Sequence, residues 1–184
     1  MSKILKLMTI LFMSFALVCC GDDEEEEMNA GEGADFSLGN LSRGKAALSV
    51  SGAESFEFDN ATVVGSNVQV TIEGKEYNVL TIVMGESGNS QQLVSIGFYV
   101  PASDGTLPNN GNVPITFQLA AEDNTYAAVS IIGSDIYDSN TATSGSITIS
   151  NSSSANNSFD AVFDLENISS FSDTSVDLEG AFRF

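Results

Sequence analysis

Apolar and polar residues alternate with a period of two along most of the chain after about residue 50. Val68, Val70 and Ile72, for example, alternate with Asn, Gln and Thr. Such alternation predicts strands with one buried face and one face in water. Clusters of Gly, Asn, Asp and Ser separate the strands. The segments that carry the pattern are 56–58, 68–72, 77–84, 94–100, 115–119, 126–132, 146–150, 159–165 and 176–184.

This series predicts an all-β fold, either an antiparallel β-sandwich or a barrel-like sandwich of about nine or ten strands. No window shows a helical face with capping residues. Segment 77–84 is apolar on both faces and is expected at the centre of the core. Segments 101–112, 133–144 and 151–158 are expected to be surface loops, where binding sites commonly lie.

The last strand has the clearest pattern. Val176, Leu178, Phe182 and Phe184 share one face by period two, so this face is expected in the core. Gly180 occupies the remaining position, where a neighbouring chain can approach closely. Arg183 points to the other face and is expected to matter little for stability.

The N-terminus has the features of an export signal. Lys3 and Lys6 precede a short apolar stretch, 7–18, which is too short to cross a bilayer as a helix, since that needs roughly 20 residues. Leu17, Val18 and Cys19 before Cys20 resemble the lipobox of bacterial lipoproteins. Cleavage before Cys19 fits less well, because it places Val18 at the last position of the signal.

The resemblance implies that residues 1–19 are removed and that Cys20 is acylated. The mature chain then has no thiol for a disulfide. Several acyl chains on one residue give stable membrane anchoring. The acids 22–27 resemble the export signal of Bacteroidota surface lipoproteins, which implies an outer-membrane lipoprotein on the cell surface; the alternative is one that faces the periplasm.

Residues 20–43 are rich in acids and small residues and are predicted to be a flexible tether, followed by one domain at 44–184. Near the end, a Gly-x-Ile-x-Ile strand at 145–149 and a Gly-x-Phe-x-Phe strand at 180–184 resemble small uncharacterised Bacteroidota lipoproteins. That resemblance implies location and fold type, and no activity.

The charge of the chain excludes some partners. Without the signal, four bases remain against 25 acids, a net charge of −21. Nucleic acids and anionic headgroups both require a basic surface, so neither is an expected ligand. The expected partners are the membrane, through the lipid, and an envelope protein or a glycan.

The residue types limit the available chemistry. The chain has no His, which excludes Ser-His-Asp and Cys-His catalysis and the His-bearing zinc sites. We therefore expect a non-enzymatic binding or display role. The alternative is a small carboxylate-based hydrolase, for instance of glycosides, or a carrier of a small ligand.

Two loops and one tyrosine are the remaining candidates for a site. Segments 104–112 and 122–124 supply oxygen atoms suited to calcium, but their spacing matches no standard calcium loop and turn formation explains the same residues. No cofactor is expected, with structural calcium as the alternative. Glycan sites commonly use flat aromatic side chains, and Trp is absent. Tyr137, in segment 134–139, is the tyrosine we expect to be exposed and the candidate ligand contact.

Overall fold

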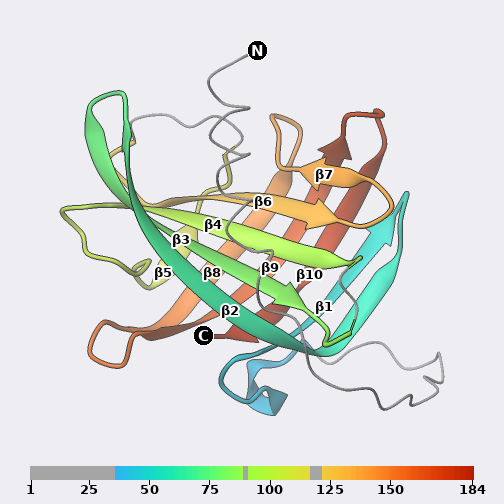
Figure 1. The fold of residues 1–184 in the computed structure, drawn as a ribbon, viewed down its shortest axis with the longest axis horizontal. Helices are drawn as coiled ribbons and strands as arrows, with labels where there is room; N and C mark the ends of the chain where they lie inside the picture. Colours follow the sequence, from blue (N-terminus) through green and yellow to red (C-terminus); the bar gives the residue numbers. More distant parts are fainter. Residues whose placement is uncertain (1–35, 89–90, 117–121) are drawn as a thin grey trace. The chain divides into compact units, whose positions relative to one another are not determined.

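Strands make up almost all of the regular structure (Figure 1). The computed structural model describes residues 36–88, 91–116 and 122–184, which belong to the compact unit Gly31–Phe184. No helix among them is long and apolar enough to span a membrane. The elements are one short 3₁₀ helix, η1 (Leu38–Asn40), and the strands β1 (Lys45–Gly52), β2 (Phe56–Ile72), β3 (Lys75–Gly85), β4 (Leu93–Pro101), β5 (Gly111–Val113), β6 (Tyr126–Ile132), β7 (Ile136–Asp138), β8 (Ser144–Ser153), β9 (Ser158–Ser170) and β10 (Ser175–Arg183).

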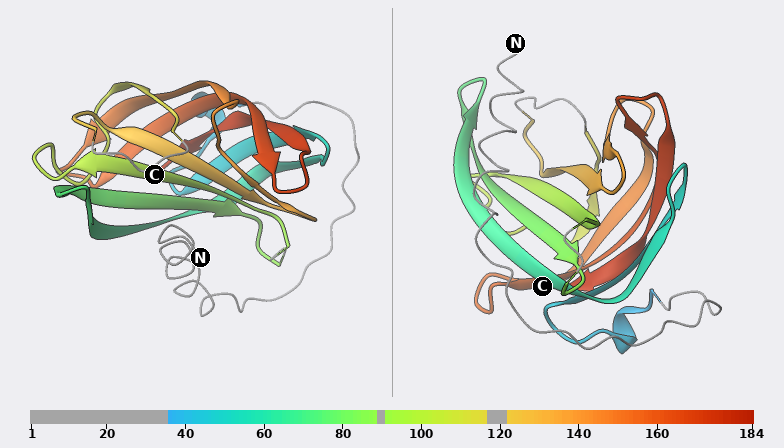
Figure 2. Two further views of the ribbon diagram at one scale, coloured as in Figure 1. Left: turned by 90° about the horizontal axis from the view of Figure 1, so that it is seen from above. Right: turned by 45° about the vertical axis from the view of Figure 1, so that its right-hand side comes forward.

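The strands close into an antiparallel barrel, so the predicted all-β, barrel-like fold is confirmed (Figures 1 and 2). Eight strands form the ring in the order β10-β1-β2-β3-β4-β6-β7-β9, and β9 pairs back with β10. β8 pairs with β9, and β5 pairs with β8. Closure removes most of the open edges that a flat sheet of this size would have.

Two short segments cover the edge of β6. At one end, Ser130–Ile132 pairs with β7, which was predicted to be loop. At the other end, Ile115 forms a parallel bridge with Ala127, and the Thr116 N–H donates to the Ala127 carbonyl at 2.8 Å. The predicted strand 115–119 is therefore reduced to this bridge in its described part, and 117–119 lies outside the described residues.

β2 and β3 form a long, continuous hairpin. Their register runs without a bulge from Thr62 opposite Gly85 to Ile72 opposite Lys75. Glu73 and Gly74 both have positive φ, 48° and 88°, as the two central residues of a type I′ turn require. This turn twists in the same sense as the strands and so suits a regular hairpin. The hairpin extends well beyond the end of β1 (Figure 1).

Side chains fill the barrel interior. The ring of Phe159 lies 5.5 Å from those of Phe98 and Phe182, edge to face in both cases, and all three residues are fully buried. The Phe184 ring packs against the same ring from the end of the barrel. Aliphatic side chains from the inner faces of the other strands complete this core.

Gly180 permits the close pairing of β10 with β1, as the sequence pattern predicted. A Cβ atom at this position would lie 2.6 Å from the Ala47 carbonyl oxygen and 2.6 Å from the Leu48 Cβ. A side chain there would force the two strands apart, so glycine is required at this position.

Segment 36–43, which the sequence pattern assigned to the flexible tether 20–43, packs on the strands of the described fold. Leu41, with Phe36 and Leu38, packs on Ala47 and Ala181, which face outward from β1 and β10. Because both residues are small, the segment can lie close to the sheet. The Gly44 N–H donates to the Arg183 carbonyl at 2.7 Å and fixes the segment to the last strand.

Phe182 is expected to be essential for stability. Truncation of a buried Phe to Ala typically costs about 3–5 kcal/mol, which is a large part of the free energy of unfolding of a small domain. Phe182→Ala should therefore lower the urea midpoint of residues 31–184 strongly. The matched control is Phe171→Ala, because Phe171 is 87% exposed and its truncation should change the midpoint little. Equal shifts would contradict the packed core.

Candidate functional site

The packed interior leaves the outer surface as the place where a ligand can bind. The described surface is hollowed beside the β2–β3 turn and beside the β8–β9 hairpin, and loops line most of both places. A barrel of eight strands is only just wide enough for its own side chains, and here large aromatic rings occupy that space. The candidate site is therefore sought among outward-facing residues.

Tyr137, the predicted ligand contact, is not exposed. Its side chain is only 3% exposed and belongs to the main core. The segment predicted to be a loop forms β7, which pairs with both β6 and β9. In a strand, neighbouring side chains alternate between faces, so Tyr137 points inward and Ile136, 43% exposed, points outward.

Cys20, the predicted lipid attachment residue, and the acids 22–27 lie outside the described residues. What the structure adds is the point where the described fold begins, at Phe36 on the outer face of β1 and β10.

The larger hollow, of about 340 Å³, lies beside the turn between β2 and β3. Lys75, Tyr77, Pro101, Glu122 and Asp123 are among its lining residues. The Tyr77 hydroxyl donates to the Glu122 carbonyl at 2.6 Å, and Lys75 forms an ion pair with Asp123 across the hollow. The hollow thus brings together the 122–124 segment and the start of β3.

The Lys75–Asp123 pair holds both groups in their charged forms. The hydrogen bond with Asp123 raises the pKa of Lys75, and the same bond lowers the pKa of Asp123. Asp123 is therefore ill suited to act as a general acid, which needs a raised pKa. Lys75 also supplies the positive charge beside Asp123 that a bound metal ion would otherwise provide. The two side chains are 44% and 90% exposed, so the pair contributes little to stability.

Three tyrosines form a second, external cluster beside this hollow. The Tyr99 and Tyr126 rings stack at 4.8 Å with an angle of 7° between their planes, and Tyr77 meets Tyr126 edge to face. Tyr77 and Tyr126 are almost fully buried although they point away from the barrel interior. Burial raises the pKa of Tyr77 and Tyr126, so their hydroxyls stay protonated. The rings of Tyr77 and Tyr126 thus pack against each other and against apolar neighbours.

The oxygen atoms of segment 104–112 are used within the loops. Asp104 accepts from the Ser103 hydroxyl at 2.9 Å, Asn110 from the Ser152 N–H at 2.9 Å, and Asn112 from the Thr148 hydroxyl at 2.9 Å. The Asn110 and Asn112 bonds join the segment to the β8–β9 hairpin beside a hollow of about 250 Å³. Among the described residues, no three His, Cys, Asp or Glu side chains gather as a metal site would require.

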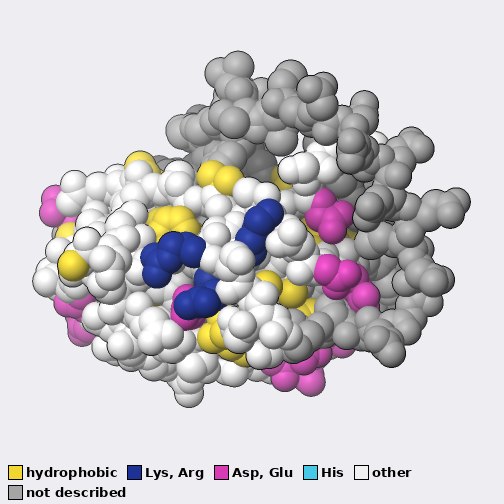
Figure 3. All heavy atoms as spheres, turned by 90° about the horizontal axis from the view of Figure 1, so that it is seen from below, with side chains coloured by type: hydrophobic (Ala, Val, Ile, Leu, Met, Phe, Trp, Pro, Cys, Tyr) yellow, Lys and Arg dark blue, Asp and Glu magenta, His cyan; other side chains and the backbone are white. Residues whose placement is uncertain are grey.

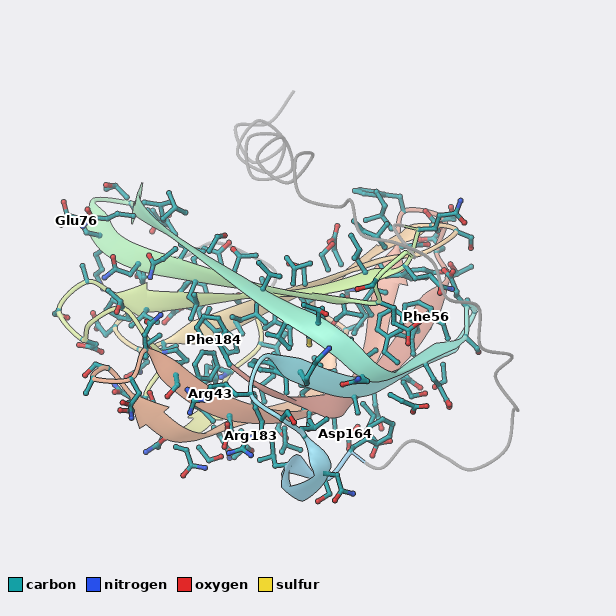
Figure 4. All side chains as sticks on the ribbon, turned by 60° about the horizontal axis from the view of Figure 1, so that its bottom comes forward. Arg43, Phe56, Glu76, Asp164, Arg183 and Phe184 are labelled. Atoms are coloured by element: carbon teal, nitrogen blue, oxygen red, sulfur yellow. The ribbon has the colours of Figure 1, made fainter. Side chains whose placement is uncertain are left out.

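Most of the cations of the domain gather in one place. Lys45 lies opposite Arg183 in the β1–β10 register, and Arg43 donates to the Phe184 main-chain oxygen at 3.4 Å. Figure 3 shows Lys and Arg side chains grouped on one face, and Figure 4 shows Arg43 and Arg183 beside Phe184. The remaining cation, Lys75, lies at the larger hollow. This basic cluster adjoins the segment that begins the described fold.

Arg183 is not a free surface residue, although it points to the outer face as predicted. Its Nε donates to Asp160 at 3.3 Å, and its Nη1 donates to the Leu41 carbonyl at 3.1 Å. Asp160 is only 3% exposed and also accepts from the Asn151 amide at 2.8 Å. Arg183 therefore provides the counter-charge of a buried carboxylate, and the expectation that it matters little is not supported by these contacts.

Comparison of the chain with protein-family models, curated proteins and solved structures gives no match.

Arg183→Ala should destabilise the domain, because it leaves the Asp160 carboxylate buried without its cation. Loss of the partner of a buried polar group costs about 1–3 kcal/mol, and more when the group is charged. Lys45→Ala is the control, since among the described residues the Lys45 side chain makes one hydrogen bond, an exposed one to the Asn60 carbonyl. Chemical denaturation should give a clearly lower midpoint for Arg183→Ala, and Asp160→Asn in the same chain should restore part of the loss. Equal midpoints for the two single variants would contradict this role.

Proposed function

We propose that this chain is a lipid-anchored outer-membrane protein, exposed on the cell surface, whose barrel serves as a non-enzymatic binding or display module. Three features of the N-terminal sequence support the anchorage: the short apolar stretch, the lipobox-like residues before Cys20, and the acidic run after it. The partner that this proposal implies is an envelope protein or a glycan.

The packed interior is the observation that carries the binding or display role. A carrier of a small ligand needs an enclosed cavity, whereas the core of this barrel is filled by its own side chains. A carboxylate-based hydrolase needs two acids that face one substrate. At the larger hollow Asp123 is paired with Lys75, which weighs against this alternative.

The packing of the described N-terminal segment limits how far the barrel can lie from the membrane. Because segment 36–43 packs on the barrel, the linker to the lipid is shorter than the sequence pattern indicated. The 15 residues between Cys20 and Phe36 can span at most roughly 55 Å. Like charges in the acidic run favour an extended linker.

Cys20 should carry the lipid. Growth of cells with a palmitate analogue should label the full-length protein, and Cys20→Ala should abolish the label, because the nucleophile for acylation is lost. Cys19→Ala is the matched control and should retain the label, since alanine is also accepted before the cleavage point. Label that is lost with Cys19→Ala and kept with Cys20→Ala would contradict the assignment.

The acids 22–27 should direct surface display without contributing to folding. Their replacement by Ser and Asn should leave the thermal stability of the domain unchanged, because repelling carboxylates in a solvated linker gain nothing from the fold. The same change should reduce cleavage by protease added to intact cells. Unchanged cleavage would show that the acids act only as a spacer.

A further inference from the structure

Within the described part of the chain, the barrel leaves a long edge of β2 open. β1 pairs with β2 only from Phe56 to Thr62, whereas β2 continues to Ile72. Beyond Val63, whose N–H donates to the Gly44 carbonyl at 2.9 Å, the edge of β2 that faces away from β3 makes no main-chain hydrogen bond with any described residue. Figure 4 shows β2 crossing the front of the barrel toward the turn beside Glu76.

The register of the hairpin identifies the groups on this edge. In a hairpin with a two-residue turn, the flanking residues Ile72 and Lys75 form a hydrogen-bonded pair, and such pairs recur at every second residue. The even-numbered residues of β2 therefore bond to β3. The N–H and C=O groups of Gly65, Asn67, Gln69 and Thr71 point to the open edge. The Val63 bond to Gly44, on the same edge, agrees with this phase.

This edge lacks the usual protection against strand pairing. Natural edge strands are commonly guarded by a charged side chain, a proline or a bulge. Segment 64–72 contains no charged residue and no proline, and its pairing with β3 has no bulge. No residue from 64 to 71 is buried, and Val64 and Val68 are 51% and 46% exposed on the outer face. An open, uncharged edge with exposed valines is a surface for β-strand addition.

We propose that this edge pairs with the same edge of a second copy of the chain, antiparallel and with the two-fold axis at Val68. This register places Gly65 opposite Thr71 and Asn67 opposite Gln69 of the second copy, so every free main-chain group on the edge finds a partner. It also places Val68 opposite Val68 and Val64 opposite Ile72 on the outer face. Apolar residues thus meet apolar residues across the axis, as a self-complementary two-fold interface requires.

Charge favours this edge over the rest of the surface. The chain has a net charge of −19, so two copies repel each other, and contacts between acid-bearing surfaces are unfavourable. Segment 64–72 contains no acid. The pairing depends on the open edge and not on anchorage, so it holds for the protein whether or not Cys20 carries a lipid.

Photocrosslinking of the full-length chain in cells tests the proposal. Two copies with different epitope tags are produced together, and one carries benzoylphenylalanine in place of Val68. Irradiation should give an adduct that contains both tags, with the crosslink in segment 64–72 of the second copy. The control position is Val162, which is 42% exposed on the outer face of β9 and should give no such adduct.

Two further variants separate strand pairing from a general loss of structure. With the probe moved to Val64, Gln69→Pro should abolish the adduct, because it removes an edge N–H while leaving the bonds to β3 intact. Val68→Asp, which places two carboxylates at the axis, should abolish it as well. The melting temperature should change little in both. Adducts with other proteins alone, a yield no higher than at Val162, or an adduct unaffected by both variants would overturn the proposal.

Discussion

The pairing of β9 with β10 is the interaction on which the rest of the structure depends. β10 joins β1 to β9 and closes the ring, and β9 in turn holds β7 and β8. The same two strands bring Phe159 and Phe182 into contact at the centre of the core. The two strands that close the barrel therefore also supply aromatic side chains that fill its interior. Any binding role is consequently moved to the outer surface.

The strands of the core could be predicted from period-two alternation because each has one face in contact with other side chains. Gly180 could be recognised for the same reason, as a missing side chain in an otherwise regular apolar series. β5 and β7 could not, since each has only three residues and forms because the edge of a neighbouring strand is available. Tyr137 was misplaced as a result. Its orientation is set by pairing with Ile131 and Ser170, which are distant from its own segment.

Residues that point outward and are nevertheless buried were not recognised from the period-two alternation alone. Asp160 alternates regularly with core residues of β9 and would be expected in water, but Arg183 and Asn151 cover it. Ala47 and Ala181 are buried because segment 36–43 lies on them. That segment was assigned to the tether because the residues before it are rich in acids. The small size of both alanines was the available sign, since a sheet exposed to solvent has no need of small apolar side chains.

The distribution of charge constrains which outer surfaces can associate. Acids are spread over several outward strand positions, such as Asp164 and Glu179, and over turns, whereas most cations of the domain gather where the last strand meets the N-terminal segment. At that place Arg183 is already paired with Asp160, and Arg43 with a main-chain oxygen, so much of their hydrogen-bonding capacity is used within the domain. The open edge of β2 differs, because its main-chain groups have no partner among the described residues and its side chains carry no charge. Hydrogen-bonding groups without a partner are more costly to exclude from water than paired ones, so a protein that covers this edge has to supply main-chain donors and acceptors, as a strand does.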